Sequence, residues 1–280
     1  MTELDKTDLP QPGPGSVKLL SFNIHAGTST ARYHHYLTHG WRQVLPHHQR
    51  TANLNGIAAL VSGYDLVALQ EVDSGSLRSG FINQASYIAS HAGMPHWHHQ
   101  ANRKVGNMSL SGNSFMGRIA PTRVEEHRLP GAIPGRGFLL LRFGALDALS
   151  IAVVHLALGR RARVQQLAYM SNALRQEPQL LVMGDFNTGV NSPEMRSFCA
   201  GLGLEAPTAG LASYPAWQPQ RSIDHILVSR ALRTRDVRVL DAPMSDHCPV
   251  ALTLDLPAGL ALATPNLTDP IADGVRASLA

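Results

Sequence analysis

The chain has 280 residues, 44% of them hydrophobic, and its 24 basic and 20 acidic residues give a net charge of +4. This length and apolar content can bury the core of one large domain, and no run of about 18 apolar residues predicts a membrane span. The mild positive charge permits an anionic partner without requiring one. Because the leader lacks an apolar segment and the two cysteines stand far apart, we expect a cytoplasmic protein without a disulfide framework.

Apolar runs bounded by Gly, Pro and polar residues alternate with helical patterns along the chain. We predict a flexible leader over 1–16, one domain over 17–256 and a tail over 257–280. The Gly/Asn/Ser-rich segment 102–113 is expected to be a flexible loop. The predicted strands are 17–24, 64–70, 96–101, 113–116, 123–129, 137–143, 149–155, 180–184, 222–228 and 250–256, and the predicted helices are 51–62, 81–91, 160–175 and 193–199.

The segment 28–50 is rich in His and aromatic residues and is longer than an ordinary connection between a strand and a helix, so we predict an insertion. Its histidines could bind metal, yet no pair has a zinc-ligand spacing, and we interpret them as surface or packing residues. Because the segment leaves the strand end that carries Asn23, it is expected to shape a pocket there. Its aromatic side chains could instead bury against the neighbouring helix.

The predicted helix 160–175 is amphipathic. Its inward face is expected to consist of Val164, Leu167, Ala168 and Leu174. The three arginines in its first turn, Arg160, Arg161 and Arg163, are interpreted as a solvated face.

Polar side chains recur at one place in the predicted strands, the carboxyl end, where α/β sheets hold their chemistry. Asp185 and Asn187 follow the strand 180–184 and, being two residues apart, face the same way. Either residue alone is also an ordinary turn residue. A set at corresponding strand ends, however, predicts a shared site, and the other members of the set are Asn23, Glu71, His155, Asp246 and His247.

Three of these residues suggest metal binding. Glu71, Asp246 and Asn23 offer hard oxygen ligands, which suit Mg²⁺ or Mn²⁺ rather than zinc. A divalent cation at a phosphoryl group neutralises charge on its oxygens and on the leaving group while water attacks from the opposite side. The sequence therefore predicts a phosphoester hydrolase that depends on Mg²⁺ or Mn²⁺.

The remaining residues are interpreted as groups that move protons or donate hydrogen bonds. Asp185, steered by Asn187, could accept a proton from water. His247 could donate a hydrogen bond to a developing oxyanion, with Asp224 holding its imidazole in one tautomer. His155 would supply a second donor. Asp224 could instead be a strand residue satisfied by backbone groups.

Six motifs stand in a fixed order along residues 17–256. They are Ser-Phe-Asn23-Ile, Leu-Gln-Glu71-Val-Asp, Val-His155-Leu, Gly-Asp185-Phe-Asn187, Ile-Asp224-His-Ile-Leu-Val-Ser and Ser-Asp246-His247-Cys-Pro. In this order they resemble the endonuclease/exonuclease/phosphatase superfamily, whose members include DNase I, abasic-site endonucleases, inositol-polyphosphate 5-phosphatases and neutral sphingomyelinases. The resemblance implies an α/β (α+β) fold of the DNase I-like kind, a four-layer sandwich of two packed mixed β-sheets flanked by helices, with the site at one edge.

The resemblance also implies the division of roles given above, with metal ligands, a water-activating pair and two phosphate-binding histidines. The segment Gly-Asn-Ser-Phe-Met-Gly-Arg resembles a family strand that lines the pocket, so Asn113 and Arg118 are expected to bind substrate.

Two departures from the family pattern bear on the substrate. The insertion 28–50 is not part of the common pattern, and position 225 is His where abasic-site enzymes usually have Tyr. No basic arm or interleaved Arg and aromatic stripe tracks a nucleic-acid backbone, and no lipid-anchoring motif is present. We expect a monomeric phosphodiesterase or phosphatase acting on a small or lipid-derived phosphate ester. A DNA or RNA nuclease is the alternative, and a catalytically silent binding module is the third.

Overall fold

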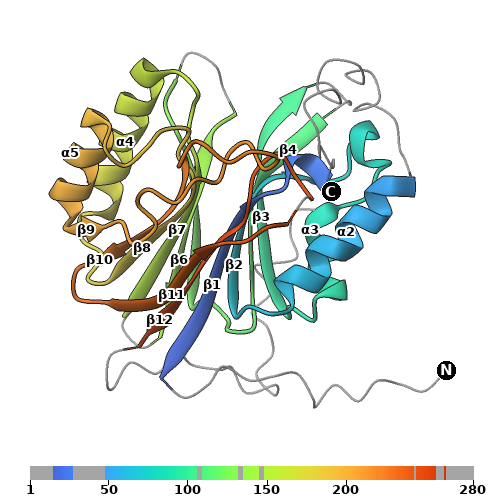
Figure 1. Ribbon diagram of the computed structural model, residues 1–280, viewed down its shortest axis with the longest axis horizontal. Coiled ribbons are helices and arrows are strands. Elements are labelled where there is room, and N and C mark those ends of the chain that lie inside the picture. Colours follow the sequence, from blue (N-terminus) through green and yellow to red (C-terminus); the bar gives the residue numbers. More distant parts are fainter. Residues whose placement is uncertain are drawn as a thin grey trace.

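Two mixed six-stranded β-sheets pack face to face and are covered by helices on both outer sides, which confirms the expected four-layer sandwich (Figure 1). The computed structural model describes residues 15–27, 48–105, 109–131, 135–144, 148–242, 244–256 and 262. The first sheet has the order β11-β12-β1-β2-β4-β3. Its strands are β1 (Ser16–Asn23), β2 (Leu66–Asp73), β3 (His96–Val105), β4 (Ser109–Gly117), β11 (Arg233–Val239) and β12 (Val250–Asp255).

The second sheet has the order β5-β6-β7-β8-β10-β9. Its strands are β5 (Arg123–Arg128), β6 (Gly137–Phe143), β7 (Leu149–His155), β8 (Leu180–Asp185), β9 (Leu204–Glu205) and β10 (Asp224–Ser229). The α-helices of the described residues are α2 (His48–Val61) and α3 (Gln84–His91) on the first sheet, and α4 (Arg160–Leu174) and α5 (Pro193–Leu202) on the second. No described helix combines the length and the apolar character needed to cross a membrane.

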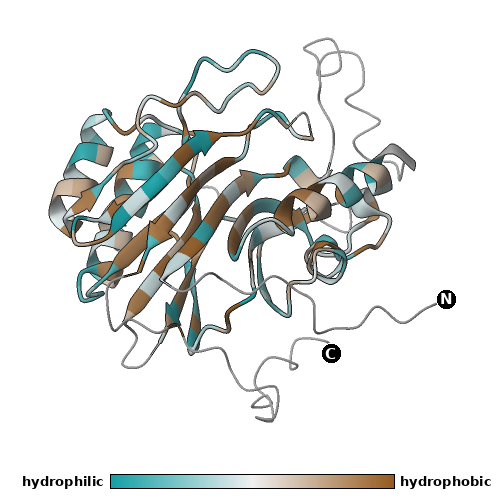
Figure 2. Cartoon of the chain, turned by 60° about the horizontal axis from the view of Figure 1, so that its bottom comes forward, coloured by the Kyte–Doolittle hydropathy of each residue, from teal (hydrophilic) through white to brown (hydrophobic). Residues whose placement is uncertain are grey.

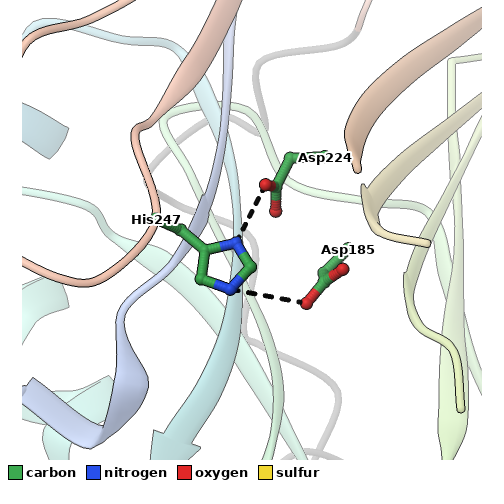
Figure 3. A group of neighbouring side chains, drawn as sticks. All are labelled: Asp185, Asp224 and His247. Atoms are coloured by element: carbon green, nitrogen blue, oxygen red, sulfur yellow. Dashed lines mark hydrogen bonds and ion pairs between the residues drawn. The ribbon is translucent and has the colours of Figure 1, made fainter. Parts of the chain in front are cut away.

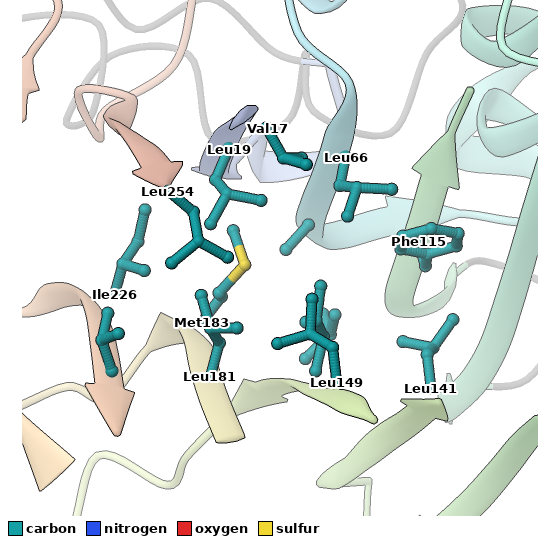
Figure 4. Packing of buried hydrophobic residues seen from close by; sticks show 14 of the residues in the cluster. Val17, Leu19, Leu66, Phe115, Leu141, Leu149, Leu181, Met183, Ile226 and Leu254 are labelled. Atoms are coloured by element: carbon teal, nitrogen blue, oxygen red, sulfur yellow. The ribbon is translucent and has the colours of Figure 1, made fainter. Parts of the chain in front are cut away.

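Side chains alternate between the two faces of each strand, and this alternation divides the core into layers. Leu19 of β1 faces the opposite sheet, whereas Leu20 packs under α2 and α3. The cluster between the sheets includes Phe115, Leu141 and Met183 (Figure 4), and hydrophobic residues run along the strands (Figure 2). Burial of each such side chain stabilises the fold by about 1.5–3 kcal/mol. The cluster therefore holds the two sheets firmly against each other.

One edge of the sandwich collects the ends of strands from both sheets. The pairs β1·β2 and β7·β8 are parallel, and each pair ends at this edge. Strands β10 and β12 run antiparallel to β8 and β1, so β10 and β12 begin at this edge. We call it the polar edge, because the polar residues singled out by the sequence lie along it, starting with Asn23 at the end of β1.

The second strand is longer than predicted and contains a β-bulge. Its pairing with β4 shifts register between Leu69 and Val72. Glu71, within the shift, has φ of 56°, a left-handed conformation that is uncommon outside glycine. The bulge interrupts the in-and-out alternation of β2 and keeps the Glu71 side chain partly exposed at the polar edge.

Two local predictions are wrong. The segment 102–113 is not a flexible loop over most of its length, because β3 and β4 pair from Val105 and Ser109 back to His96 and Gly117. The polar residues of this segment occupy the ladder of a β-hairpin, where backbone pairing overrides their turn preference.

The predicted face of α4 is also partly wrong. Val164 and Ala168 are exposed, whereas Arg163 and Gln166 are buried with Leu167. The buried polar pair reaches back to the segment before the helix. Arg163 donates to the carbonyls of residues 157 and 158, and Gln166 accepts from the backbone nitrogen of residue 157. These bonds satisfy backbone groups next to the helix start, which the periodicity of apolar residues does not reveal.

Other expectations fall outside the described residues. They concern the leader up to residue 14, most of the insertion at 28–47, and the tail at 257–261 and from 263 onward. Of the predicted tail, Leu262 is described and packs against the core between the sheets.

Candidate active site

Asp185 stands at the centre of the polar edge, at the end of β8. Register places His155 of β7 directly opposite it on one side and Asp224 of β10 opposite it on the other. The preceding residue must be glycine, because Gly184 has φ of 149° and a Cβ there would lie 1.9 Å from the carbonyl oxygen of Val154. This close approach of β7 and β8 brings the side chains of three adjacent strands together.

The Asp185 carboxylate is buried and held by groups from several elements. The Asn23 amide donates to its Oδ2 at 3.1 Å, and the backbone nitrogen of Asn187 donates to its Oδ1 at 2.8 Å. His155 Nε2 lies 3.4 Å from Oδ2, and His247 Nε2 lies 3.9 Å from it. Burial and the neighbouring Asp224 raise the pKa of Asp185 above its ordinary value, because both disfavour the charged carboxylate.

His247 is fixed between two carboxylates (Figure 3). Its Nδ1 donates to Asp224 Oδ2 at 2.9 Å, and its Nε2 faces Asp185. The same Asp224 oxygen accepts a hydrogen bond from Ser213 at 2.6 Å. Although burial alone would lower it, the pKa of His247 is raised well above its ordinary value by the charge and hydrogen bond of Asp224 and by Asp185. The imidazole is therefore held in one orientation and keeps its proton.

Three residues with oxygen atoms that could ligate a metal lie beside His247 and its two carboxylates. Asn23 is already joined to Asp185, and its Oδ1 accepts from the backbone nitrogen of His25 at 3.1 Å. Asp246 follows Ser245, whose hydroxyl donates to the Asn23 carbonyl at 2.7 Å. Glu71 Oε1 lies 3.9 Å from His155 Nε2. The structure thus brings the three predicted ligand residues to the polar edge, and two carboxylates with one amide oxygen suit Mg²⁺ or Mn²⁺.

A second group also has the spacing of a metal site. The ligand atoms of Asp185, Asp224 and His247 lie within 4.8 Å of one another. Metal binding requires a neutral imidazole with a free lone pair, whereas the two carboxylates favour the protonated ring. The two carboxylates therefore suit this group to proton and hydrogen-bond chemistry, and the neighbouring oxygens of Asn23 and Glu71 offer a better fit to a divalent cation.

The sequence and fold were compared with those of known proteins. A sequence model of the Endonuclease/Exonuclease/phosphatase family matches residues 51–247. The chain belongs to this family. No curated protein gives a sequence match. The residues of the polar edge are therefore the candidate active site of an endonuclease/exonuclease/phosphatase family member.

Solved structures share the fold at low sequence identity. An endonuclease/exonuclease/phosphatase from Beutenbergia cavernae DSM 12333 is 17% identical with a TM-score of 0.66, over 86% of this chain and 72% of that chain. Sphingomyelinase C from Streptomyces griseocarneus is 17% identical, and a mannosyl-6-phosphatase from Bacteroides thetaiotaomicron VPI-5482 is 16% identical. Each of these two has a TM-score of 0.57 over 85% of this chain and 99% of its own. These likenesses support the family fold.

The family motif around Asn113 contributes differently from what the sequence predicts. The buried Asn113 amide donates to the carbonyls of Gly137 and Val153, so it joins β4 to the opposite sheet just before His155. Its amide nitrogen is engaged within the protein and is not offered to a substrate.

The structure places Arg118 away from the other predicted site residues. Gly117 pairs with Leu66 at the start of β2, so Arg118 lies at the far end of the sheet from the polar edge. There its guanidinium donates to the carbonyl of Ser62, and its backbone nitrogen donates to that of Asp65. Arg118 therefore links β4 to the turn after α2.

Three residues of this family member escape the sequence analysis. Ser213 and Ser245 are buried and orient Asp224 and Asn23, but an isolated serine in a loop carries no distinctive signal. His25 Nδ1 lies 3.4 Å from Asp246 Oδ1. It begins a left-handed turn over His25–Gly27, and the glycine at its end is the one local signal for that turn.

The predicted partner of Asp185 also has a defined place. Asn187 has φ of 54°, and its side-chain amide donates to the carbonyl of Leu156 at 2.9 Å. The left-handed turn lets its backbone nitrogen reach back to the Asp185 carboxylate. Asn187 therefore fixes Asp185 through its backbone and ties the end of β8 to the end of β7.

Proposed function

We propose that the chain is a divalent-metal-dependent phosphoester hydrolase, a phosphodiesterase or phosphatase that directs activated water at a small or lipid-derived phosphate ester. One observation carries the proposal: the buried Asp185 carboxylate, with its raised pKa, lies beside the protonated imidazole of His247 and within hydrogen-bond distance of Asn23. A base, a cationic donor and neighbouring metal ligands at one edge are the groups that phosphoester hydrolysis needs.

Asp185 is the group best placed to take a proton from water. A general base works best when its pKa approaches the working pH, and burial moves Asp185 in that direction. Asn23 and the backbone of Asn187 each hold one of its oxygens, so the carboxylate presents a fixed geometry to the attacking water. Asp185 therefore acts as the base.

His247 and His155 are the donors toward the phosphoryl oxygens. Asp224 fixes the His247 ring through Nδ1, which leaves Nε2 facing Asp185 and the site. His155 Nε2 points into the same space, 3.4 Å from Asp185. Preorganised donors of this kind stabilise charge that develops in the transition state.

Glu71, Asp246 and Asn23 are the proposed ligands of the cation. Bound there, Mg²⁺ or Mn²⁺ would neutralise charge on the phosphoryl oxygens and the leaving group. The names of two fold relatives, a sphingomyelinase and a sugar phosphatase, agree with a diester or monoester substrate that is not a nucleic acid.

The test is a substrate panel in Mg²⁺, in Mn²⁺ and in a chelator. It contains a chromogenic phosphodiester, a chromogenic phosphomonoester, phospholipid vesicles, plasmid DNA and an abasic duplex. We expect metal-dependent turnover of an ester other than DNA, and Asp224→Asn should lower kcat by about 10²–10⁴-fold because the neutral amide no longer fixes His247.

Two outcomes contradict the proposal. Turnover that is strongest on plasmid or abasic DNA would make the protein a nuclease. Full activity of Asp224→Asn beside an inactive His247→Ala variant would disprove the pairing of these residues.

A further inference from the structure

The loop after β2, residues 74–83, holds two large apolar side chains in solvent. Phe81 is 71% exposed and Leu77 is 41% exposed. The loop is nevertheless tightly built around the buried Asp73, whose carboxylate accepts hydrogen bonds from the backbone of Gly75 and from the backbone and hydroxyl of Ser76. Its ends are joined by a β-bridge between residues 74 and 83. The apolar side chains are therefore presented by a rigid loop.

Phe81 also has a strained backbone. Its φ is 62°, a left-handed conformation that is an outlier for a bulky residue. The backbone nitrogen of Phe81 donates to the carbonyl of Ser76, which fixes the residue in this turn. Asn or Gly would adopt the conformation more easily and would avoid exposing a ring to water. An exposed, strained aromatic residue indicates that the side chain itself is used.

The loop after β7, residues 156–159, has the same design. Leu158 is 77% exposed. Around it, the buried Arg163 donates to the carbonyls of Ala157 and Leu158, and the buried Gln166 accepts from the backbone nitrogen of Ala157. Buried polar groups thus pin this loop while its one large apolar tip stays in water.

The two loops flank the candidate active site. Strands β2 and β7 end at the polar edge, so both loops leave from it, and α3 and α4, which follow them, lie on opposite sides of the sandwich (Figure 1). Among the described residues the other exposed large apolar side chains are Trp97, Val164 and Tyr169. Trp97 pairs with Met116 near the far end of the sheet, away from this edge.

The charge of the loops favours an anionic surface. Neither 74–83 nor 156–163 contains an Asp or Glu residue. Arg160 and Arg161 follow Leu158 after one intervening residue, Gly159, and are exposed. Glu194 pairs with Arg160 and with the buried Arg163, which leaves Arg161 without an ion-pair partner among the described residues. Apolar tips beside exposed arginines are the pattern of a protein that sits on anionic lipid.

We propose that Leu77, Phe81 and Leu158 form an apolar rim that docks the polar edge onto an anionic phospholipid surface. The inference rests on the proposed function in one respect, since docking would bring the site to an ester embedded in that surface. The rigid support of both loops reduces the ordering cost of docking. A nucleic-acid partner fits less well, because three separated apolar tips offer no continuous basic track.

The test measures cosedimentation of the full chain with vesicles of phosphatidylcholine and phosphatidylglycerol in equal parts, and with pure phosphatidylcholine. Wild type should bind the anionic vesicles more tightly. Phe81→Asn and Leu158→Asn should each weaken binding by about tenfold, the factor that burial of one such side chain supplies. Arg161→Gln should weaken binding to anionic vesicles by about fivefold and leave binding to neutral ones unchanged.

The strained backbone gives an internal control for folding. Because Asn tolerates a positive φ, Phe81→Asn should unfold at the same temperature as wild type or a higher one while binding vesicles less. Trp97→Ser, an exposed aromatic at the far end, should bind vesicles like wild type. Hydrolysis of a soluble chromogenic phosphodiester should be unchanged in Phe81→Asn.

Several outcomes separate the docking surface from the proposed function. Wild-type-like vesicle binding by both Asn variants, or no vesicle binding by wild type, would overturn the rim. Loss of duplex DNA binding in the same variants, with vesicle binding intact, would show that the rim binds nucleic acid and not lipid. Vesicle binding that depends on Phe81 without turnover of any ester would leave the rim standing and refute the hydrolase.

Discussion

The two ends of strand β7 carry two ionic groups that differ in how closely their charges are paired. At its start, Ser150 donates to Glu177, and Arg142 of the neighbouring strand binds the same carboxylate through two nitrogens, at 2.8 and 3.2 Å. At its end, His155 lies 3.4 and 3.9 Å from the carboxylates of Asp185 and Glu71. The first group is closely paired, whereas the second is held at longer distances.

The difference extends to the buried oxygens. Glu177 has partners on both oxygens. Asp224 Oδ1, at the polar edge, is buried without a hydrogen-bond partner among the described residues, and the pKa of Asp185 is raised by burial and by Asp224. Close pairing of charges stabilises a fold, while incomplete compensation keeps groups ready to exchange protons. Close pairing at Glu177 therefore supports the structure, whereas the incompletely paired groups at the polar edge are the candidates for chemistry.

The largest expected effect comes from Asp185→Asn. The variant should lose about 10³-fold in kcat on the best ester substrate, because the proposed general base is removed. It should not lose stability at pH 8, since a carboxylate with a raised pKa opposes folding when it is ionised. Steady-state kinetics and thermal unfolding of the same preparation measure both quantities. A stable variant with wild-type kcat would remove Asp185 from the chemistry.

The opposite result is expected for Glu177→Gln. Loss of one charge from the closely paired group leaves Arg142 with Glu125 as its remaining carboxylate partner and should lower the free energy of unfolding by about 3 kcal/mol. The kcat of the folded variant should be unchanged. Glu205→Gln, which breaks the exposed pair with Arg230, is the control and should cost less than about 1 kcal/mol. Equal costs in urea titrations would contradict the distinction.

His99 tests whether an incompletely paired, buried imidazole outside the candidate active site lowers stability without serving a function. Burial and the nearby His98 lower the pKa of His99 to about 4, and within the part of the chain that the structure describes its Nε2 has no hydrogen-bond partner. The folded pKa lies below the unfolded value, so this contribution to stability is complete above about pH 6.5 and is lost as the pH falls toward 4. Between pH 6.5 and 5 the loss should be about 2 kcal/mol.

The matched variant is His99→Gln, which removes the titrating group. Its free energy of unfolding should change correspondingly less over the same pH interval, while turnover stays at the wild-type level. A wild-type pH dependence of stability in this variant would show that other groups cause the acid sensitivity.

The smallest effect is expected from a change in one of the proposed metal ligands. Glu71→Gln should weaken Mn²⁺ binding by about tenfold, because it replaces an anionic ligand with a neutral one of the same shape. Isothermal titration calorimetry measures the affinity directly. Glu126→Gln, a change in an exposed carboxylate paired with His98, is the control and should bind Mn²⁺ like wild type. Unchanged affinity and stoichiometry in Glu71→Gln would exclude this residue as a ligand.

The convergence of the polar edge could be predicted because strand periodicity and chain direction together determine where a strand end lies. Asn23, Glu71 and Asp185 each close an apolar run, so their neighbourhood follows once the strands are recognised. The same logic fails for Arg118. It lies five positions after Asn113, about 17 Å along an extended strand, so the motif runs from the middle of β4 to just beyond its end.

Other features depend on tertiary contacts that leave little trace in the sequence. Arg163 looks like one of three surface arginines, and only the folded loop before α4 shows that it is buried. Ser213 likewise acquires its role from a partner 11 positions away, and His25 from one far along the chain. Short polar residues in loops are common, so their pattern predicts turns and does not predict which buried oxygen they reach.

The pairing of β1 with β12 has a consequence for how the protein is made. Ser245 reaches the carbonyl of Asn23 across 222 positions, and β12 inserts between β11 and β1. During synthesis the first strand can pair early with β2, but it must wait for nearly all of the domain before its second neighbour, β12, arrives. Asp246 and His247 are delivered by that same late segment, so a nascent chain holds Glu71 and Asp185 long before it can assemble the site. The candidate site is thus completed only when this late segment arrives, and a ribosome-bound fragment lacking it carries no complete site.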